Sequence, residues 1–142
     1  MPDLPGGNVF FLKVPNDSML EKKGFYSVRS VTDCGEGRYR VMVLLNKEHE
    51  IFKGHFPGNP VTPGACMLQV VKELAEDILG MKLMMTRAAN VKFMALINPE
   101  KNPELRMELE IDATDKGRIG IKNTTLFEEV TALKMSNTYK KI

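Results

Sequence analysis

The stretch HFPGNPVTPGACMLQVVKELAEDIL, residues 55–79, joins a rigid loop to a long apolar segment. Its second part, residues 65–79, contains no glycine or proline and is too long for an ordinary strand, so it predicts a helix. The first half of this helix is apolar on nearly all sides, which is typical of a helix buried in a core. Gly80 follows and can end the helix in a left-handed conformation.

The residues before this helix have the features of a functional helix start. Thr62 can cap the helix, and Pro63 can occupy its first position, where a missing N–H costs nothing. Gly64 leaves its own N–H open to a polarised carbonyl oxygen at the positive end of the helix dipole. The stiff turn at residues 57–60 would hold His55 near this N–H, so that a base and an oxyanion donor face one substrate. The simpler alternative is a tight strand-to-helix connection in which His55 is a partly buried loop residue.

The segments on either side of the helix have the alternation of strands. FYSVRSV (25–31) and RYRVMVLL (38–45) are rich in β-branched and aromatic residues and predict a hairpin, preceded by a short helix that Gly24 ends. In residues 104–111 every second side chain is apolar, so one face of the predicted strand faces the core and the other faces solvent. Further strand candidates are residues 88–97, 117–127 and 129–139. The pattern predicts an α+β fold in which an antiparallel sheet of five to six strands wraps around one central helix.

Composition narrows the class of protein. With 142 residues, of which 43% are hydrophobic and 27% charged, the chain suits a single domain over residues 1–142. The net charge of +2 gives no general attraction to nucleic acid or to membranes. No segment reaches the roughly 18 apolar residues of a membrane span and no signal pattern opens the chain, so we expect a cytoplasmic protein. Cys34 and Cys66 lie far apart without a ligand pattern, so we expect neither a disulfide framework nor a metal site.

The motif HFPGNPVTPG, residues 55–64, followed by an apolar helix, resembles the active-site signature of the bacterial 3-hydroxyacyl-[acyl carrier protein] dehydratases of the hot-dog fold, the Z-type and A-type enzymes. The VKF segment at 91–93 is similar to a segment that lines the acyl tunnel of that family. The resemblance extends loosely over residues 25–135, whereas residues 1–24 match poorly. It implies a hot-dog domain that eliminates water from a 3-hydroxyacyl thioester to give the trans-2-enoyl thioester, in fatty acid or related acyl-chain biosynthesis, without a metal or an organic cofactor.

The resemblance also implies roles for individual residues. His55 corresponds to the base that takes the proton from C2 of the substrate, and Gly64 to the glycine whose N–H binds the thioester carbonyl oxygen. The other residues placed at the substrate are Phe56, Pro63, Ala65 and Phe93. The implied partners are an acyl carrier protein, with the acyl chain on its phosphopantetheine arm, and a second copy of the chain in a homodimer or larger homo-oligomer.

Position 69 departs from the family pattern. The family has an acidic residue fourteen positions after the histidine, which reaches in from the partner subunit of a dimer and helps the C3 hydroxyl to leave as water. Here that residue is Gln69. Glutamine cannot supply a proton at neutral pH, and a positioned general acid typically contributes about 10²- to 10⁴-fold in rate. Four residues on, where many Z-type members have a glutamine, this chain has Glu73 on the same helix face. Two interpretations remain open: Glu73 is a relocated acid while Gln69 orients the hydroxyl, or Glu73 begins the solvated end of the helix beside Lys72 and Glu76.

Two other functions also remain open. Gln69 favours a catalytically impaired hot-dog protein that binds acyl thioesters or serves as the partner subunit of an active homologue. An acyl thioesterase shares the fold and the oxyanion site at the helix start, but needs a carboxylate or an activated water at the thioester carbon. The intact motif at residues 55–64 favours dehydration over hydrolysis.

Overall fold

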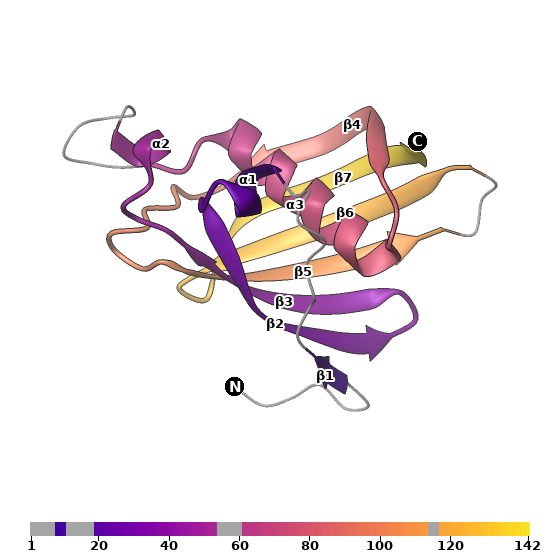
Figure 1. Cartoon of the computed structure of the whole chain (residues 1–142), viewed down its shortest axis with the longest axis horizontal. Helices are drawn as coiled ribbons and strands as arrows, with labels where there is room; N and C mark the ends of the chain where they lie inside the picture. The colour runs from indigo at the N-terminus through magenta and orange to yellow at the C-terminus, as the bar shows by residue number, and fades with distance from the viewer. Residues whose placement is uncertain (1–7, 11–18, 54–60, 114–116) are drawn as a thin grey trace.

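The computed structural model describes residues 8–10, 19–53, 61–113 and 117–142 (Figure 1). Within these residues, seven strands form one antiparallel sheet in the order β1-β2-β3-β5-β6-β7-β4. The strands are β1 (Asn8–Phe10), β2 (Tyr26–Gly35), β3 (Arg38–Leu45), β4 (Leu83–Phe93), β5 (Glu104–Asp112), β6 (Ile119–Phe127) and β7 (Val130–Lys141). The predicted hairpin is β2 with β3, and the three-residue β1 is an addition to the predicted sheet.

In the described part of the chain three helices accompany the sheet, and the longest lies across one of its faces. They are α1 (Met19–Lys22), α2 (Glu50–Lys53) and α3 (Gly64–Leu79). Figure 1 shows α3 in front of the sheet, with the strands running behind it. This is the predicted hot-dog arrangement, in which a curved antiparallel sheet wraps around one central helix. No helix among the described residues is long and apolar enough to cross a membrane.

The core lies between α3 and the sheet. One face of α3 contributes the fully buried side chains Met67, Val70, Val71 and Leu74. They pack against inward-facing side chains of the sheet, among them Val41, Leu105, Met107, Ile121 and Leu133. The alternation predicted for residues 104–111 is confirmed, because the apolar side chains of β5 are buried while its charged ones are exposed or half-buried. The helix stop is also confirmed, since Gly80 has φ 66° and donates its N–H to the Glu76 carbonyl oxygen at 2.8 Å.

Strand β4 begins earlier than predicted and ends the sheet on one side. The sequence predicts a strand over residues 88–97, whereas β4 starts at Leu83, directly after the helix stop. Among the described strands it pairs with β7 alone, so most of its side chains are exposed. The alternation is weak because an edge strand that covers little of the core needs no buried face. A register shift between Ala89 and Lys92, with Asn90 at φ 54°, further bends the strand.

Candidate active site

Helix α3 begins with a backbone N–H that remains available. Pro63 is the N-cap, with φ −62° and ψ 141°, and its carbonyl oxygen accepts hydrogen bonds from the first turn. Gly64 is therefore the first helical residue, and its N–H makes no hydrogen bond to another described residue. Because the helix dipole is positive at this end, the N–H suits a polarised carbonyl oxygen.

The predicted cap at Thr62 is wrong. Its hydroxyl and its N–H both donate to the Ile97 carbonyl oxygen, each at 2.9 Å, and its side chain is buried. These bonds tie the residue before the helix to the segment that follows β4, so the hydroxyl is not used for capping. Pro63 is consequently the N-cap, so the cap lies one residue later in the chain than predicted.

Phe93, near the end of β4, lies against Gly64. A β-carbon added to Gly64 would be 2.7 Å from Cζ of Phe93, so the absence of a side chain at position 64 makes room for the ring. The Phe93 side chain is nevertheless 54% exposed, which places the ring over the helix start and outside the core. Since Pro63 and Ala65 flank Gly64, four of the residues predicted to bind substrate gather at this end of α3.

Two further predicted site residues, His55 and Phe56, lie outside the described residues. The described chain resumes at Val61, immediately before the helix start. The base and the second aromatic residue therefore stay predictions from the sequence.

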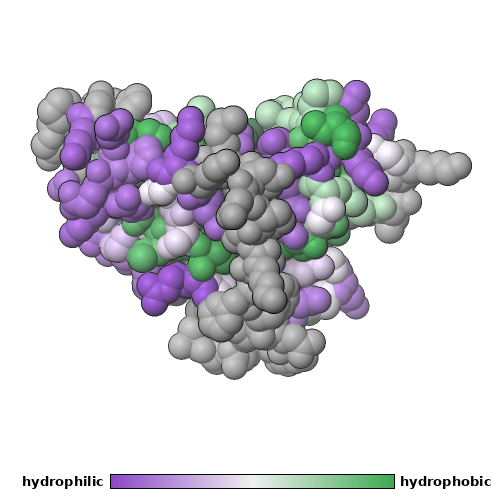
Figure 2. Space-filling view, in the orientation of Figure 1, coloured by the Kyte–Doolittle hydropathy of each residue, from purple (hydrophilic) through white to green (hydrophobic). Residues whose placement is uncertain are grey.

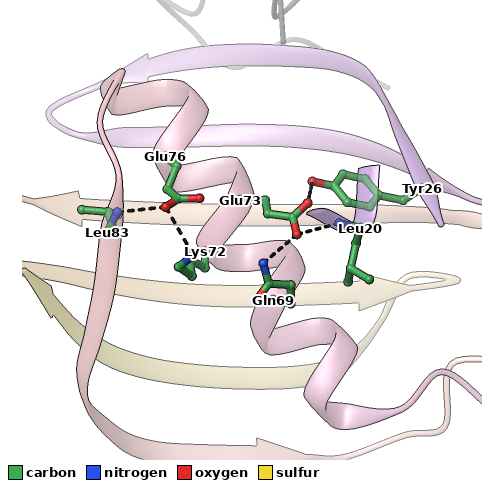
Figure 3. A network of polar contacts seen from close by, with 7 residues as sticks. All are labelled: Leu20, Tyr26, Gln69, Lys72, Glu73, Glu76 and Leu83. Atoms are coloured by element: carbon green, nitrogen blue, oxygen red, sulfur yellow. Dashed lines mark hydrogen bonds and ion pairs between the residues drawn. The ribbon is translucent and has the colours of Figure 1, made fainter. Parts of the chain in front are cut away.

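Gln69 and Glu73 contact each other on one face of α3. Gln69 Nε2 donates a hydrogen bond to Glu73 Oε2 at 2.7 Å (Figure 3). The contact follows from the helical spacing of four residues, which stacks two side chains on the same side. Gln69 is half-buried, whereas Glu73 is fully buried.

Four donors surround the Glu73 carboxylate. They are the N–H of Leu20 at 2.9 Å, the N–H of Glu21 at 3.2 Å, the hydroxyl of Tyr26 at 2.9 Å and Nε2 of Gln69 at 2.7 Å. Two of them are backbone groups of α1, so the carboxylate ties α1 to α3. A buried carboxylate is tolerated only with such partners.

The interpretation of Glu73 as the start of a solvated helix end is wrong. The four-residue helix α1 packs on α3 at this point and excludes water from the carboxylate. Sequence reasoning missed both α1 as a cover and Tyr26 as a partner. The one signal was the aromatic pair Phe25 and Tyr26 at the start of a predicted strand, because a buried tyrosine hydroxyl requires a hydrogen-bond partner.

Glu76 is a second buried carboxylate, one turn further along α3. Its Oε2 accepts a hydrogen bond from the Leu83 N–H at 2.8 Å and lies 3.3 Å from Lys72 Nζ (Figure 3). It therefore fixes the start of β4 against the end of the helix. Its side chain is only 8% exposed, so the prediction of a solvated helix end fails here as well.

Glu21 adds a titratable group beside this network. Burial, followed by the charges of Asp77 and Glu73, raises the pKa of Glu21 from its ordinary value of 4.5 to about 7, against a smaller lowering by a hydrogen bond with Tyr26. Its Oε2 is buried and makes no hydrogen bond within the described part of the chain. Glu21 is thus half ionised near neutral pH.

The described chain offers no metal site, and a further cavity lies away from this end of α3. The described residues contain no group of three or more His, Cys, Asp or Glu side chains placed to hold a metal ion. A cavity of about 600 Å³ lies on the sheet and is lined by residues of β2, β3, β5 and β6, among them Arg38, Tyr39 and Lys122. None of the predicted site residues within the described part of the chain lines it, so the candidate site remains the first half of α3 with Phe93.

Comparisons with known proteins bear on the family and the fold of the chain. The family of ApeI-like proteins, which is described as ApeI dehydratase, matches residues 31–128. The 3-hydroxyacyl-[acyl-carrier-protein] dehydratase FabZ of Haemophilus influenzae is 31% identical over 107 residues, which cover 71% of this chain and 71% of the relative. FabZ of Clostridium acetobutylicum is 32% identical over 79 residues, or 51% of this chain. That match spans about half of the curated relative, 54% of its length.

Solved structures show the same fold. A chain of the dehydratase heterocomplex ApeI:P from Xenorhabdus doucetiae has a TM-score of 0.66 at 18% identity, over 80% of this chain and 96% of that chain. A hypothetical thioesterase with coenzyme A from Streptococcus pneumoniae has a TM-score of 0.60 at 12% identity, over 89% of this chain and 95% of that chain. At these identities the similarity shows the hot-dog fold alone.

Proposed function

The chain belongs to the ApeI-like dehydratase family, and from this we propose that it eliminates water from a 3-hydroxyacyl thioester to give the trans-2-enoyl thioester. The observation that carries the proposal is the N–H of Gly64 at the positive end of α3, which makes no hydrogen bond within the described residues, with Phe93 beside it and Gln69 further along the same helix. A carbonyl-binding donor and a polar side chain thus lie on one buried helix. The motif at residues 55–64 adds a histidine nine residues before Gly64.

The proposed chemistry begins at C2 of the substrate. The Gly64 N–H binds the thioester carbonyl oxygen and stabilises the negative charge that develops there. His55 takes the C2 proton, the electron pair forms the C2–C3 double bond, and the C3–O bond breaks. Because Gln69 has no proton to give at neutral pH, the protonated His55 returns the C2 proton to the leaving oxygen, and water departs. No net proton is gained or lost by the protein.

The proposed substrate carrier is an acyl carrier protein, which the names of the FabZ relatives include. Exposed cations on β4, the strand that ends at Phe93, are suited to bind an acidic partner. Lys92 precedes Phe93 on β4, and Arg87 lies one bulge earlier on the same strand. Both side chains are exposed.

We also propose a homodimer that joins two copies of β4. This strand is the last of the sheet and has an exposed apolar surface unusual for a water-facing edge. The exposed apolar side chains in β4 and directly after it are Met84, Met85, Phe93, Met94 and Leu96, which are 40% to 67% exposed. Figure 2 shows apolar side chains at the upper edge of this view, where β4 lies in Figure 1. Pairing of two β4 strands would cover both this surface and the sheet edge.

Gln69 supports a second candidate function. A hot-dog protein without the acid of an active dehydratase can bind acyl thioesters or complete an active homologue as its partner subunit. The ApeI:P structure is described as a dehydratase heterocomplex, so a family member does assemble with a different chain. In that role the Gly64 N–H binds the thioester without turnover.

One assay distinguishes these functions. The purified protein is given a 3-hydroxyacyl thioester and a saturated acyl thioester, each on acyl carrier protein, and both enoyl product and free thiol are measured. The proposal predicts enoyl product from the first substrate and no thiol from either. His55→Ala abolishes the activity, whereas the matched variant His49→Ala retains it, since the ring nitrogens of His49 contact the Lys23 carbonyl oxygen and the Ile51 N–H, both outside the candidate site. Thiol release would identify a thioesterase, and binding without product would identify a partner subunit.

A further inference from the structure

The two ends of the Gln69 side-chain amide have opposite hydrogen-bonding character. The nitrogen can only donate, and the carbonyl oxygen can only accept. The face that this residue presents to a ligand therefore depends on which end contacts Glu73. The surroundings of Glu73 decide that question.

Every other partner of the Glu73 carboxylate among the described residues is a donor. The N–H groups of Leu20 and Glu21 have no acceptor capacity, and they contact different oxygens of the carboxylate. The Tyr26 hydroxyl lies 2.9 Å from Oε1, and burial together with the charge of Glu73 raises the pKa of Tyr26, so this hydroxyl keeps its proton and donates. A carboxylate that receives these three hydrogen bonds is an acceptor at both oxygens.

The amide of Gln69 is oriented by this pattern. Its nitrogen lies 2.7 Å from Glu73 Oε2, as Figure 3 shows, and the reverse orientation would place two oxygen acceptors in contact. The carbonyl oxygen therefore points away from Glu73. Within the described residues it makes no hydrogen bond, and the side chain is half-buried.

We infer that Tyr26 and Glu73 are positioning residues that hold Gln69 Oε1 as a fixed acceptor for the C3 hydroxyl of the acyl chain, so that the site selects 3-hydroxyacyl over saturated acyl thioesters. The inference rests on the proposed function, because it concerns the same site and substrate. Tyr26 and the N–H groups of α1 hold Glu73, and Glu73 holds Gln69. Glu73 thus acts through Gln69 and gives no proton to the substrate.

Selectivity follows from the polarity of the acceptor. A substrate hydroxyl donates to Gln69 Oε1 and satisfies it, whereas a saturated chain at the same place removes water from the oxygen and offers no donor. Leaving a buried acceptor unsatisfied typically weakens binding by about tenfold or more. The preference disappears when the amide is free to turn.

The orientation is tested by NMR without any substrate. In ¹⁵N-labelled protein the Gln69 side-chain amide is assigned from its loss in Gln69→Leu. We expect one amide proton to be shifted downfield and protected from exchange, and the shift to be reduced in Tyr26→Phe and lost in Glu73→Gln. Glu76→Gln is the matched control, because Glu76 is a buried carboxylate of the same helix whose recorded partners are Leu83 and Lys72. A Gln69 amide with the shift and exchange rate of a free glutamine in the wild type would overturn the inference.

Selectivity is tested by calorimetric binding of 3-hydroxyacyl and saturated acyl pantetheine thioesters in a His55→Ala background, which prevents turnover. We expect about a tenfold preference for the hydroxyacyl ligand, which falls to less than about twofold when Glu73→Gln or Gln69→Leu is added and stays unchanged with Glu76→Gln. If Glu73→Gln does not fold, Tyr26→Phe replaces it in the test. Tyr26→Phe keeps the carboxylate and is expected to give an intermediate preference. A preference that survives Glu73→Gln overturns the positioning role. If neither thioester binds, the proposed function and the selectivity fail together, while the amide spectrum still decides the orientation.

Discussion

Gln69 Nε2 lies 2.7 Å from Glu73 Oε2, so a neutral amide at the position of the family's acid is tied to a buried carboxylate one helical turn away. Acid and amide are exchanged along one face of α3 relative to the pattern of the Z-type enzymes. The carboxylate contacts α1 and β2, whereas the amide is the member of the pair that is half-buried. Under the proposed function, the exchange changes which chemical group faces the substrate, while the fold stays the same.

Replacing Glu73 by glutamine should destabilise the protein by about 2 kcal/mol, because the buried donors of α1 and Tyr26 lose an ionised acceptor. The free energy of unfolding is measured by urea denaturation at neutral pH. Glu110→Gln is the matched control, since Glu110 is an exposed carboxylate of β5. Its change should stay within about 0.5 kcal/mol. Equal effects of the two variants would contradict the network.

Stability should fall with rising pH through the titration of Glu21. The pKa of Glu21 is about 7 in the folded protein and 4.5 ordinarily, so the folded state holds the proton more tightly than the unfolded state. The contribution of this group is fully present below the ordinary pKa and is lost as the pH rises through the folded pKa. Tm measured from about pH 5 to about pH 8 should therefore decline more in the wild type than in Glu21→Gln, which cannot ionise. A steeper decline of Tm in Glu21→Gln than in the wild type would contradict the raised pKa of Glu21.

Gly64→Ala should lower kcat/KM about tenfold while changing the free energy of unfolding by less than about 1 kcal/mol. The added methyl group would lie 2.7 Å from Phe93 Cζ, but this ring is exposed enough to move away. Its displacement alters the site without opening the core. The double variant Gly64→Ala, Phe93→Ala serves as the control and should be no less active than Phe93→Ala alone. Additive losses would show that the two residues do not interact.

Charges introduced on β4 should separate the proposed dimer. The wild type is expected to elute at twice the chain mass of 16.0 kDa, and the variant carrying Met84→Lys and Met85→Lys at the mass of one chain. The reason is that two copies of the strand would then bring lysines together across the interface. Val130→Lys changes an equally exposed apolar residue at the start of β7 and should leave the dimer intact. Light scattering after gel filtration gives both masses, and a wild-type monomer would contradict the interface.

The central helix and most of the sheet were predictable because each depends on a short-range pattern. The apolar run that ends at Gly80 specifies α3, and the period-two alternation of β5 specifies a strand with one buried face. The grouping of Pro63, Gly64 and Ala65 also follows, since consecutive residues at a helix start are necessarily close. These features need no knowledge of distant contacts.

The surroundings of Glu73 were not predictable in the same way. A carboxylate at position 73, beside Lys72 and Glu76, is typical of a helix that leaves the core. The burial of Glu73 depends on α1, whose residue Leu20 is 53 residues away along the chain. Burial of a carboxylate is decided by donors brought from elsewhere, so the local pattern carries no signal of it. The bridge from Thr62 to Ile97 was hidden for the same reason.

The most direct test is the initial rate of enoyl formation from a 3-hydroxyacyl thioester by the wild type, Gln69→Glu and the double variant His55→Ala, Gln69→Glu. A carboxyl group at position 69 can supply the proton that a glutamine side chain lacks, and a positioned general acid accelerates the loss of the C3 hydroxyl. The account predicts that Gln69→Glu is about tenfold or more faster than the wild type and that the double variant is inactive. A rate for Gln69→Glu equal to or below that of the wild type would contradict the account.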